Sequence, residues 1–223
     1  MPKPSTLKKT EQTSTEPGRN CPLCPRLVAF REEARAKHPD WFNAPVPSFG
    51  PINARLLIVG LAPGMKGANR TGRPFTGDYA GVLLYATLLK FAFASGHFDP
   101  DGKDDLQLVD ARITNAARCV PPQNKPTPEE VTTCRRFLVP TIDEMPKLKA
   151  FLVLGRIAHE TLLRTFGLKL SDYPFAHGAM HGLPNGKLLF DSYHCSRYNT
   201  QTGRLTEKMF HNVFENIKKQ IMS

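Results

Sequence analysis

The stretch "RLLIVGLAPG", residues 55–64, decides the fold class of this chain. Its apolar run ends in a turn of glycine and proline, a pattern that indicates a buried strand leading into a loop. Three more short apolar runs predict strands, within "DARITNAARC" (110–119), "AFLVLG" (150–155) and "GKLLFDSYH" (186–194). The predicted sheet therefore has four strands.

Helices are expected between and after these strands. The apolar segment 81–94 follows the first strand, residues 127–145 begin with a Thr-Pro-Glu-Glu start signal, and "RIAHETLLRTFG" (156–167) ends in glycine. Apolar residues at helical spacing indicate a C-terminal helix, namely Phe210, Val213, Phe214, Ile217 and Ile221. This alternation predicts an α/β fold with three α/β/α layers around a central, mostly parallel four-stranded sheet.

Three loops rich in polar residues follow the predicted strands, at residues 60–78, 115–119 and 194–204. In parallel sheets the carboxyl ends of the strands lie at one edge, and ligands bind beyond that edge. We therefore expect these loops to meet and to form the functional site.

The composition favours a polyanionic partner. Among 223 residues, 30 Lys and Arg against 20 Asp and Glu give a net charge of +10, which suits nucleic acid, although solvated lysine faces give the same balance. Residues 1–20 predict a disordered basic tail, and residues 21–223 a single domain. No run of about 20 apolar residues or secretory-signal core is found, so we expect a cytoplasmic protein with reduced thiols.

Four cysteines suggest a metal site. Cys21 and Cys24 form a pair with two intervening residues, Cys119 and Cys134 lie far along the chain, and Cys195 stands apart. Two close thiolates and two remote ones complete a tetrahedral set, which suits Zn²⁺ and an iron–sulfur cluster equally well. The alternative is four buried thiols that bind nothing.

The loop "GLAPGMKGANRTGRPFTGD" suggests phosphate binding. It combines Gly60 and Gly64 with Asn69, Arg70 and Arg73, so that backbone N–H groups and guanidinium forks suit an anion. The spacing matches neither the G-x-x-x-x-G-K-[ST] motif nor the G-x-G-x-x-G motif. An ATPase or a dinucleotide-dependent enzyme is therefore not indicated.

Each remaining candidate also has a purely structural explanation. Asp78 is suited to cap the helix that follows it, Asn115 to shape a turn, Phe75 to fill the core, and His194 to be a satisfied loop histidine. Their common position in strand-end loops of one sheet is what favours a functional role.

Three motifs in order, "GLAPG…NRTGRPFTGD", "TNAARC" and H-x-S-x-x-N-x-x-TGRLT, resemble the family 5 uracil-DNA glycosylases of the uracil-DNA glycosylase superfamily. The resemblance runs from Cys21 to the C-terminal helix. It implies a monomeric base-excision-repair enzyme of the bacterial or archaeal nucleoid. Such an enzyme flips uracil, hypoxanthine or xanthine out of double- or single-stranded DNA and hydrolyses the N-glycosidic bond. It also implies a 4Fe–4S cluster on Cys21, Cys24, Cys119 and Cys134.

The resemblance assigns roles to individual residues. Asp78 positions water or supports the sugar cation, Asn115 binds the base edge, Phe75 stacks on the flipped base, and His194 stabilises the leaving base. We expect the DNA contacts to be Gly60, Leu61, Gly64, Asn69, Arg70, Arg73, Phe75, Ser196, Arg197, Tyr198, Asn199 and Arg204, and we expect Tyr198 to be the wedge that fills the gap left by the extruded base.

Two departures and two alternatives accompany this interpretation. Cys195 replaces the proline that many superfamily members carry after the histidine, and Leu61 stands where a sister family has glutamate. A non-catalytic, metal-containing nucleic-acid-binding protein is the main alternative, and Asp78 argues against it. An electron-transfer iron–sulfur protein is the other, and the lack of a second cysteine set argues against that.

Overall fold

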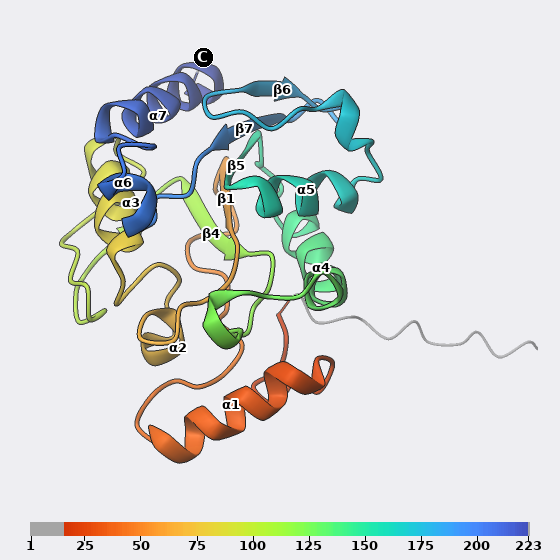
Figure 1. The fold of residues 1–223 in the computed structure, drawn as a ribbon. Coiled ribbons are helices and arrows are strands. Elements are labelled where there is room, and N and C mark those ends of the chain that lie inside the picture. Colours follow the sequence, from red (N-terminus) through yellow and green to blue (C-terminus); the bar gives the residue numbers. More distant parts are fainter. Residues whose placement is uncertain (1–15, 223) are drawn as a thin grey trace, which may run out of the picture.

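The computed structural model describes residues 16–222, which are built around a central five-stranded sheet (Figure 1). The strand order is β4-β1-β5-β7-β6. Four strands run parallel, namely β1 (Leu56–Gly60), β4 (Ala111–Asn115), β5 (Ala150–Leu154) and β7 (Leu188–Ser192). Residues 1–15 of the predicted tail lie outside the described residues.

The predicted fold class is confirmed, with one strand more than expected. All four parallel strands lie within the stretches that the sequence indicated. The fifth strand, β6 (Met180–Gly182), pairs antiparallel with β7 at the sheet edge. It was missed because its three residues are largely exposed and carry no apolar run.

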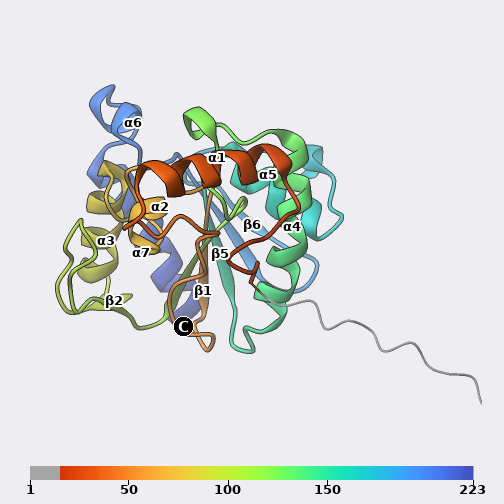
Figure 2. The same cartoon turned by 90° about the horizontal axis from the view of Figure 1, so that it is seen from below.

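Helices cover both faces of the sheet. One face carries α3 (Tyr79–Lys90) and α7 (Glu207–Met222), and the other carries α4 (Pro128–Asp143) and α5 (Arg156–Thr165) (Figure 2). Alternate residues of β1 point to opposite faces. Leu56 and Ile58 therefore pack in the α3/α7 core, whereas Leu57 and Val59 pack in the α4/α5 core.

The helix termini follow local chemistry. At the start of α4, Thr127 accepts a hydrogen bond from the Glu130 backbone N–H, and Glu130 accepts one from the Thr127 backbone N–H, a capping box. Asp78 caps α3 in the same position, and its side chain accepts from the Gly81 backbone N–H. These two starts were visible in the sequence.

Several short elements and one long helix were not predicted. In the helix α1 (Pro25–Lys37) only three residues are buried, and one of them is Arg31. It packs near the end of β4, where Arg31 contacts Cys119. The other unpredicted elements are α2 (Ala68–Thr71), β2 (Ala94–Ser95), β3 (Gln107–Leu108), η1 (Pro122–Asn124), η2 (Leu170–Asp172) and α6 (Arg197–Gln201).

Across residues 16–222, every helix is too short or too polar to cross a membrane.

Candidate active site

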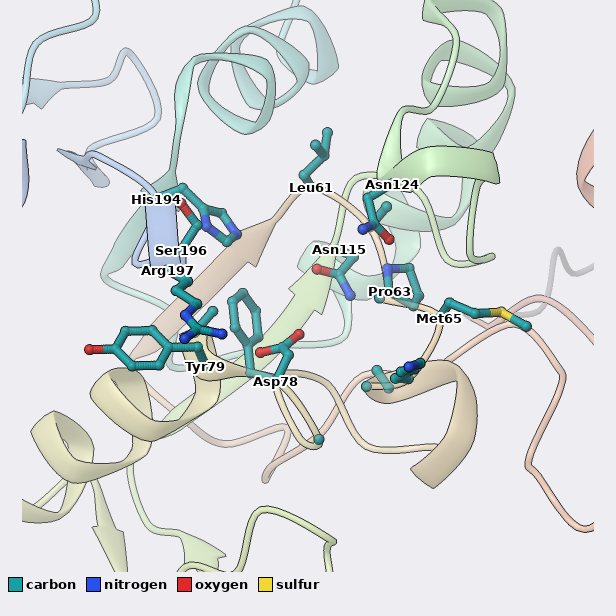
Figure 3. A pocket seen from close by; sticks show the side chains of 18 residues that line it. Leu61, Pro63, Met65, Asp78, Tyr79, Asn115, Asn124, His194, Ser196 and Arg197 are labelled. Atoms are coloured by element: carbon teal, nitrogen blue, oxygen red, sulfur yellow. The ribbon is translucent and has the colours of Figure 1, made fainter. Parts of the chain in front are cut away.

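The three strand-end loops meet around one cavity of about 590 Å³, as predicted. It is lined by residues that follow β1, β4 and β7, and by the start of α3 (Figure 3). The lining brings together Asp78, Asn115 and His194, which lie far apart in the sequence. The parallel sheet achieves this because the carboxyl ends of its strands lie at one edge.

Asn115 lines the cavity and carries an unpaired, buried acceptor. It is the last residue of β4 and is only 4% exposed. Its side-chain Oδ1 atom has no hydrogen-bond partner among the described residues. A Cβ atom at Gly60, its partner in β1, would lie 2.4 Å from this oxygen, so the glycine is needed here for space. A buried acceptor without a donor is costly, which indicates that a ligand supplies the donor.

Two stacked rings form another wall of the cavity. Phe75 and His194 have ring centroids 5.9 Å apart and planes inclined by 27°. Desolvation lowers the pKa of His194 to about 4, so its imidazole is neutral at neutral pH. A neutral imidazole carries one N–H donor. The amide of Asn199 donates to the His194 carbonyl oxygen at 2.8 Å and fixes the loop backbone.

Asp78 combines a structural contact with an open oxygen. Its Oδ1 atom accepts the hydrogen bond from the Gly81 N–H at 3.2 Å. Cβ atoms at Gly64 and Gly67 would lie 3.3 Å and 3.0 Å from the other oxygen, Oδ2. The loop glycines therefore leave room beside the carboxylate. Desolvation raises the pKa of Asp78, and two backbone hydrogen bonds oppose that rise.

The residues of the predicted phosphate clamp have partners within the protein. Arg73 forms two hydrogen bonds of 2.6 Å with Asp104, and Arg70 pairs with Asp101. The amide of Asn69 is buried and donates to Asn43 at 2.9 Å. None of the three lines the cavity. Acidic partners 31 residues away hold both arginines, and nothing local in the sequence shows this pairing.

The last loop carries the remaining predicted contacts. Ser196 caps the short helix α6 and lines the cavity together with Arg197, while Tyr198 is 71% exposed. The guanidinium of Arg204 lies 4.7 Å from the centre of the Tyr193 ring. Arg204 is exposed and thus both supports the loop and remains open to a partner.

Tyr193 in turn stacks on His177, with ring centroids 5.1 Å apart. His177 Nδ1 accepts from the Tyr193 backbone N–H at 3.1 Å. We call Arg204, Tyr193 and His177 the stacked column. Its middle member, Tyr193, directly precedes His194 in the chain, so the column adds a second support to the segment after β7.

Sequence reasoning missed some lining residues. Met65, Lys66, Tyr79 and Asn124 also border the cavity. Asn124 comes from η1 and has a φ of 57°, a conformation that Asn adopts more readily than most residues. The only available signal was the turn-forming sequence "PPQNKP", which predicts a loop and not its position.

The four cysteines also converge, as their predicted role requires. Cys21, Cys24, Cys119 and Cys134 border one small pocket, which we call the four-cysteine pocket, and all are free thiols. Desolvation raises the pKa of Cys119 to about 12 and that of Cys134 to about 11. Cys195 is fully buried in the α3/α7 core, where its thiol contacts the Ala80 carbonyl.

The four thiols are the donors to consider for a metal group. Within residues 16–222, no three His, Cys, Asp or Glu side chains are placed to hold one metal ion. Four thiols around one pocket nevertheless are the donor set that a thiolate-bound group needs. The residues present therefore fit a thiolate-bound group by the chemistry of their side chains.

Comparison with known proteins gives a consistent family match. Residues 47–218 match the family model described as the uracil DNA glycosylase superfamily. The chain is 49% identical to the Type-5 uracil-DNA glycosylase of Thermus thermophilus, over 89% of this chain and 93% of that protein. It is 42% identical to the Type-5 uracil-DNA glycosylase of Mycobacterium leprae, over 89% of this chain and 90% of that protein. A Type-4 uracil-DNA glycosylase of Pyrobaculum aerophilum is 32% identical to the chain, over 67% of this chain and 62% of that protein.

Proposed function

The chain belongs to the uracil DNA glycosylase superfamily and is a DNA glycosylase that excises uracil, and we propose that it does so in the cavity of Asp78, Asn115 and His194. This makes it a DNA repair hydrolase acting on N-glycosidic bonds. The unpaired Oδ1 of Asn115 is the observation that carries the assignment of the site.

Base recognition follows from the chemistry of the Asn115 amide. Uracil offers an N3–H donor beside the O4 acceptor, which match an amide oxygen and an amide NH₂ group. Cytosine presents the reverse, an N3 acceptor beside an amino donor. Leaving buried polar groups unpaired costs about 1–3 kcal/mol each, so the cavity disfavours cytosine. Phe75 supplies a face on which the extruded base stacks.

The reaction needs support for two opposite charges. Cleavage of the N-glycosidic bond develops positive charge on the sugar and negative charge on the base. The neutral His194 ring donates a hydrogen bond to the departing base, a preorganised contact in a desolvated site. Asp78 orients water or stabilises the sugar cation through the oxygen that does not cap α3. Leu61 lines the site but has no carboxylate. Asp78 is therefore the only acidic residue of the lining that can orient water or stabilise the sugar cation.

A wider substrate range also belongs to this proposal. Hypoxanthine and xanthine, in double- or single-stranded DNA, are the further substrates that the resemblance implies. The cavity of about 590 Å³ supports this extension because it is larger than a pyrimidine requires. Among the proposed DNA contacts, Ser196 and Arg197 line the cavity beside Leu61, Gly64 and Phe75, and Tyr198 and Arg204 are exposed.

We assign a 4Fe–4S cluster to Cys21, Cys24, Cys119 and Cys134. Thiolates on one zinc ion stand roughly 3.8 Å apart, from Zn–S bonds of about 2.3 Å in a tetrahedron, whereas a cluster needs a wider set. The convergence of the four free thiols on one pocket, together with the resemblance, supports this assignment. When bound, the cluster supplies a covalent link between the start of α1, the loop after β4 and α4.

An excision assay tests the function. The protein is incubated with a duplex that carries one uracil, and alkali then cleaves any abasic site. We expect strand cleavage at the uracil and none in the cytosine control duplex. Tight binding of both duplexes without cleavage would contradict the proposal and favour the non-catalytic nucleic-acid-binding alternative.

A further inference from the structure

Arg31 is a buried cation beside the four-cysteine pocket. Its side chain comes from α1, lines that pocket and is 2% exposed. One terminal nitrogen, Nη1, donates to Cys119 Sγ at 3.9 Å, and Nη2 donates to the Cys21 carbonyl oxygen at 3.2 Å. The third nitrogen, Nε, is buried without a hydrogen-bond partner among the described residues.

Among residues 16–222, the charge of Arg31 has only one weak carboxylate partner. The nearest carboxylate oxygen, on Glu32, lies 3.8 Å from Nε; Glu32 is largely exposed and already pairs with Arg35 at 2.9 Å. Arg118, the other buried arginine of the pocket, differs because Glu16 pairs with it at 2.9 Å. A buried charge whose only counter-charge is long-range and solvent-exposed is poorly compensated. Arg31 therefore needs an anion on the thiol side.

We propose that Arg31 is the counter-charge of the metal–thiolate group in the four-cysteine pocket, and that it stabilises this group and raises its reduction potential. The inference rests on the cluster proposed above. Four thiolates outweigh the positive charge of a cluster core, so the assembly is an anion, and uptake of one electron adds negative charge. Nearby positive charge and hydrogen bonds to sulfur favour that added charge.

The planar fork of arginine explains why this residue serves better than lysine. Its two terminal nitrogens contact Cys119 and the backbone of Cys21 at once, and these residues belong to distant parts of the chain. A lysine ammonium supplies the same charge from one point. Replacing Arg31 by lysine therefore keeps the positive charge but removes the two simultaneous hydrogen bonds, whereas replacing it by glutamine removes the charge.

The experiment compares Arg31→Gln and Arg31→Lys with Arg35→Gln. Arg35 lies one turn further along α1 and donates to the Asn43 and Arg19 carbonyl oxygens, without a cysteine contact. Each full-length protein is prepared anaerobically. Iron and sulfide content, the half-life of iron release to a chelator after ferricyanide treatment, and the midpoint potential by protein-film voltammetry are then measured.

For Arg31→Gln we expect iron release at least fivefold faster than in wild type and a more negative midpoint potential. Arg31→Lys keeps the wild-type potential but releases iron faster, since the charge remains and the fork is lost. Arg35→Gln matches wild type in both measurements. If Arg31→Gln does not fold, the potential of Arg31→Lys still tests the charge argument, because a negative shift there contradicts it.

Three outcomes overturn the proposal. The first is a wild-type half-life of iron release and a wild-type midpoint potential in Arg31→Gln. The second is that Arg35→Gln shows the same faster iron release and the same negative shift of potential as Arg31→Gln. The third is that the wild-type protein contains zinc in place of iron and sulfide. Uracil excision by the same preparations is recorded separately. Excision without a cluster would remove the role of Arg31 and leave the glycosylase assignment intact.

Discussion

Asp78 and His194 respond in opposite ways to the same desolvated cavity. Desolvation disfavours charge, so it raises the pKa of the Asp78 carboxyl and lowers the pKa of the His194 imidazole to about 4. At neutral pH the histidine is therefore an uncharged donor. The pair is suited to a reaction that separates charge, with the histidine beside the leaving base and the carboxylate beside the sugar.

Replacing His194 by Ala should lower the single-turnover rate of uracil excision by about 10²–10³, the usual loss of one preorganised donor. The reason is that the departing base loses its hydrogen bond. The control is His211→Ala, which changes a partly buried histidine next to Lys90 and Phe91 outside the cavity lining. A His194→Ala rate within threefold of wild type would show that the donor lies elsewhere.

The low pKa of His194 also predicts the pH dependence. Its folded-state pKa of about 4 lies below the ordinary value of 6.5, so the unfolded chain binds the proton more readily between these values. Stability is therefore lost as the pH falls from 6.5 towards 4, and His194→Ala should lose less over that range. Chemical denaturation of both proteins at several pH values measures this difference. An equal loss would contradict the shifted pKa.

Asp78→Asn separates the cap from the chemistry. Asn caps a helix about as well as Asp, whereas Asp78→Ala loses about 1 kcal/mol of cap stability. Because desolvation penalises the charged carboxylate, Asp78→Asn should melt at or above the wild-type temperature at pH 7.5. We expect it to be folded, to bind DNA and to be inactive in single-turnover excision. Excision at nearly the wild-type rate would show that Asp78 serves only as the cap of α3.

At the scale of elements, the segment after β7 is supported from two sides. Asn199 holds the His194 carbonyl from α6, and the stacked column holds Tyr193. Between these supports α6 projects Tyr198 outward, and this side chain is 71% exposed. An exposed aromatic ring on a fixed base suits insertion into the gap that an extruded nucleotide leaves.

Tyr198→Ala should therefore slow uracil excision from matched duplexes more than from single-stranded DNA. A single strand has no stack whose gap must be filled, so the ring contributes less there. The ratio of the two single-turnover rates is the measurement, and Tyr193→Phe is the control because it keeps the ring of the stacked column. An equal slowing on both substrates would argue against a wedge.

At the scale of the whole molecule, the four-cysteine pocket ties distant segments together. Cys119 lies four residues after the end of β4, so a cluster bound there would hold Asn115 in place. Cys195 does not line this pocket and is buried in the α3/α7 core. Anaerobically purified protein should be yellow-brown. Cys195→Ser should retain its iron, and Cys119→Ser should lose it, as metal analysis will show. Loss of iron in Cys195→Ser would mean that the four ligands were chosen wrongly.

The local sequence predicted most of the long helices and strands and the loops that form the site. Apolar runs and start signals placed the four parallel strands and the four helices that cover the sheet, because strand burial and helix capping depend on neighbouring residues. The helix α1 was not predicted, since its buried face includes Arg31, whose burial makes sense only beside the cysteines of distant segments.

The sequence by itself determined that Asp78, Asn115 and His194 share one rim, because parallel strands bring their carboxyl ends to one edge. Only the tertiary structure decided which charged side chains remain free for a ligand. Asp101 and Asp104 engage Arg70 and Arg73, whereas Arg31 is left facing thiols. The reason is physical: an ion pair or an unpaired buried group depends on which distant segment folds beside it, and no local pattern records that.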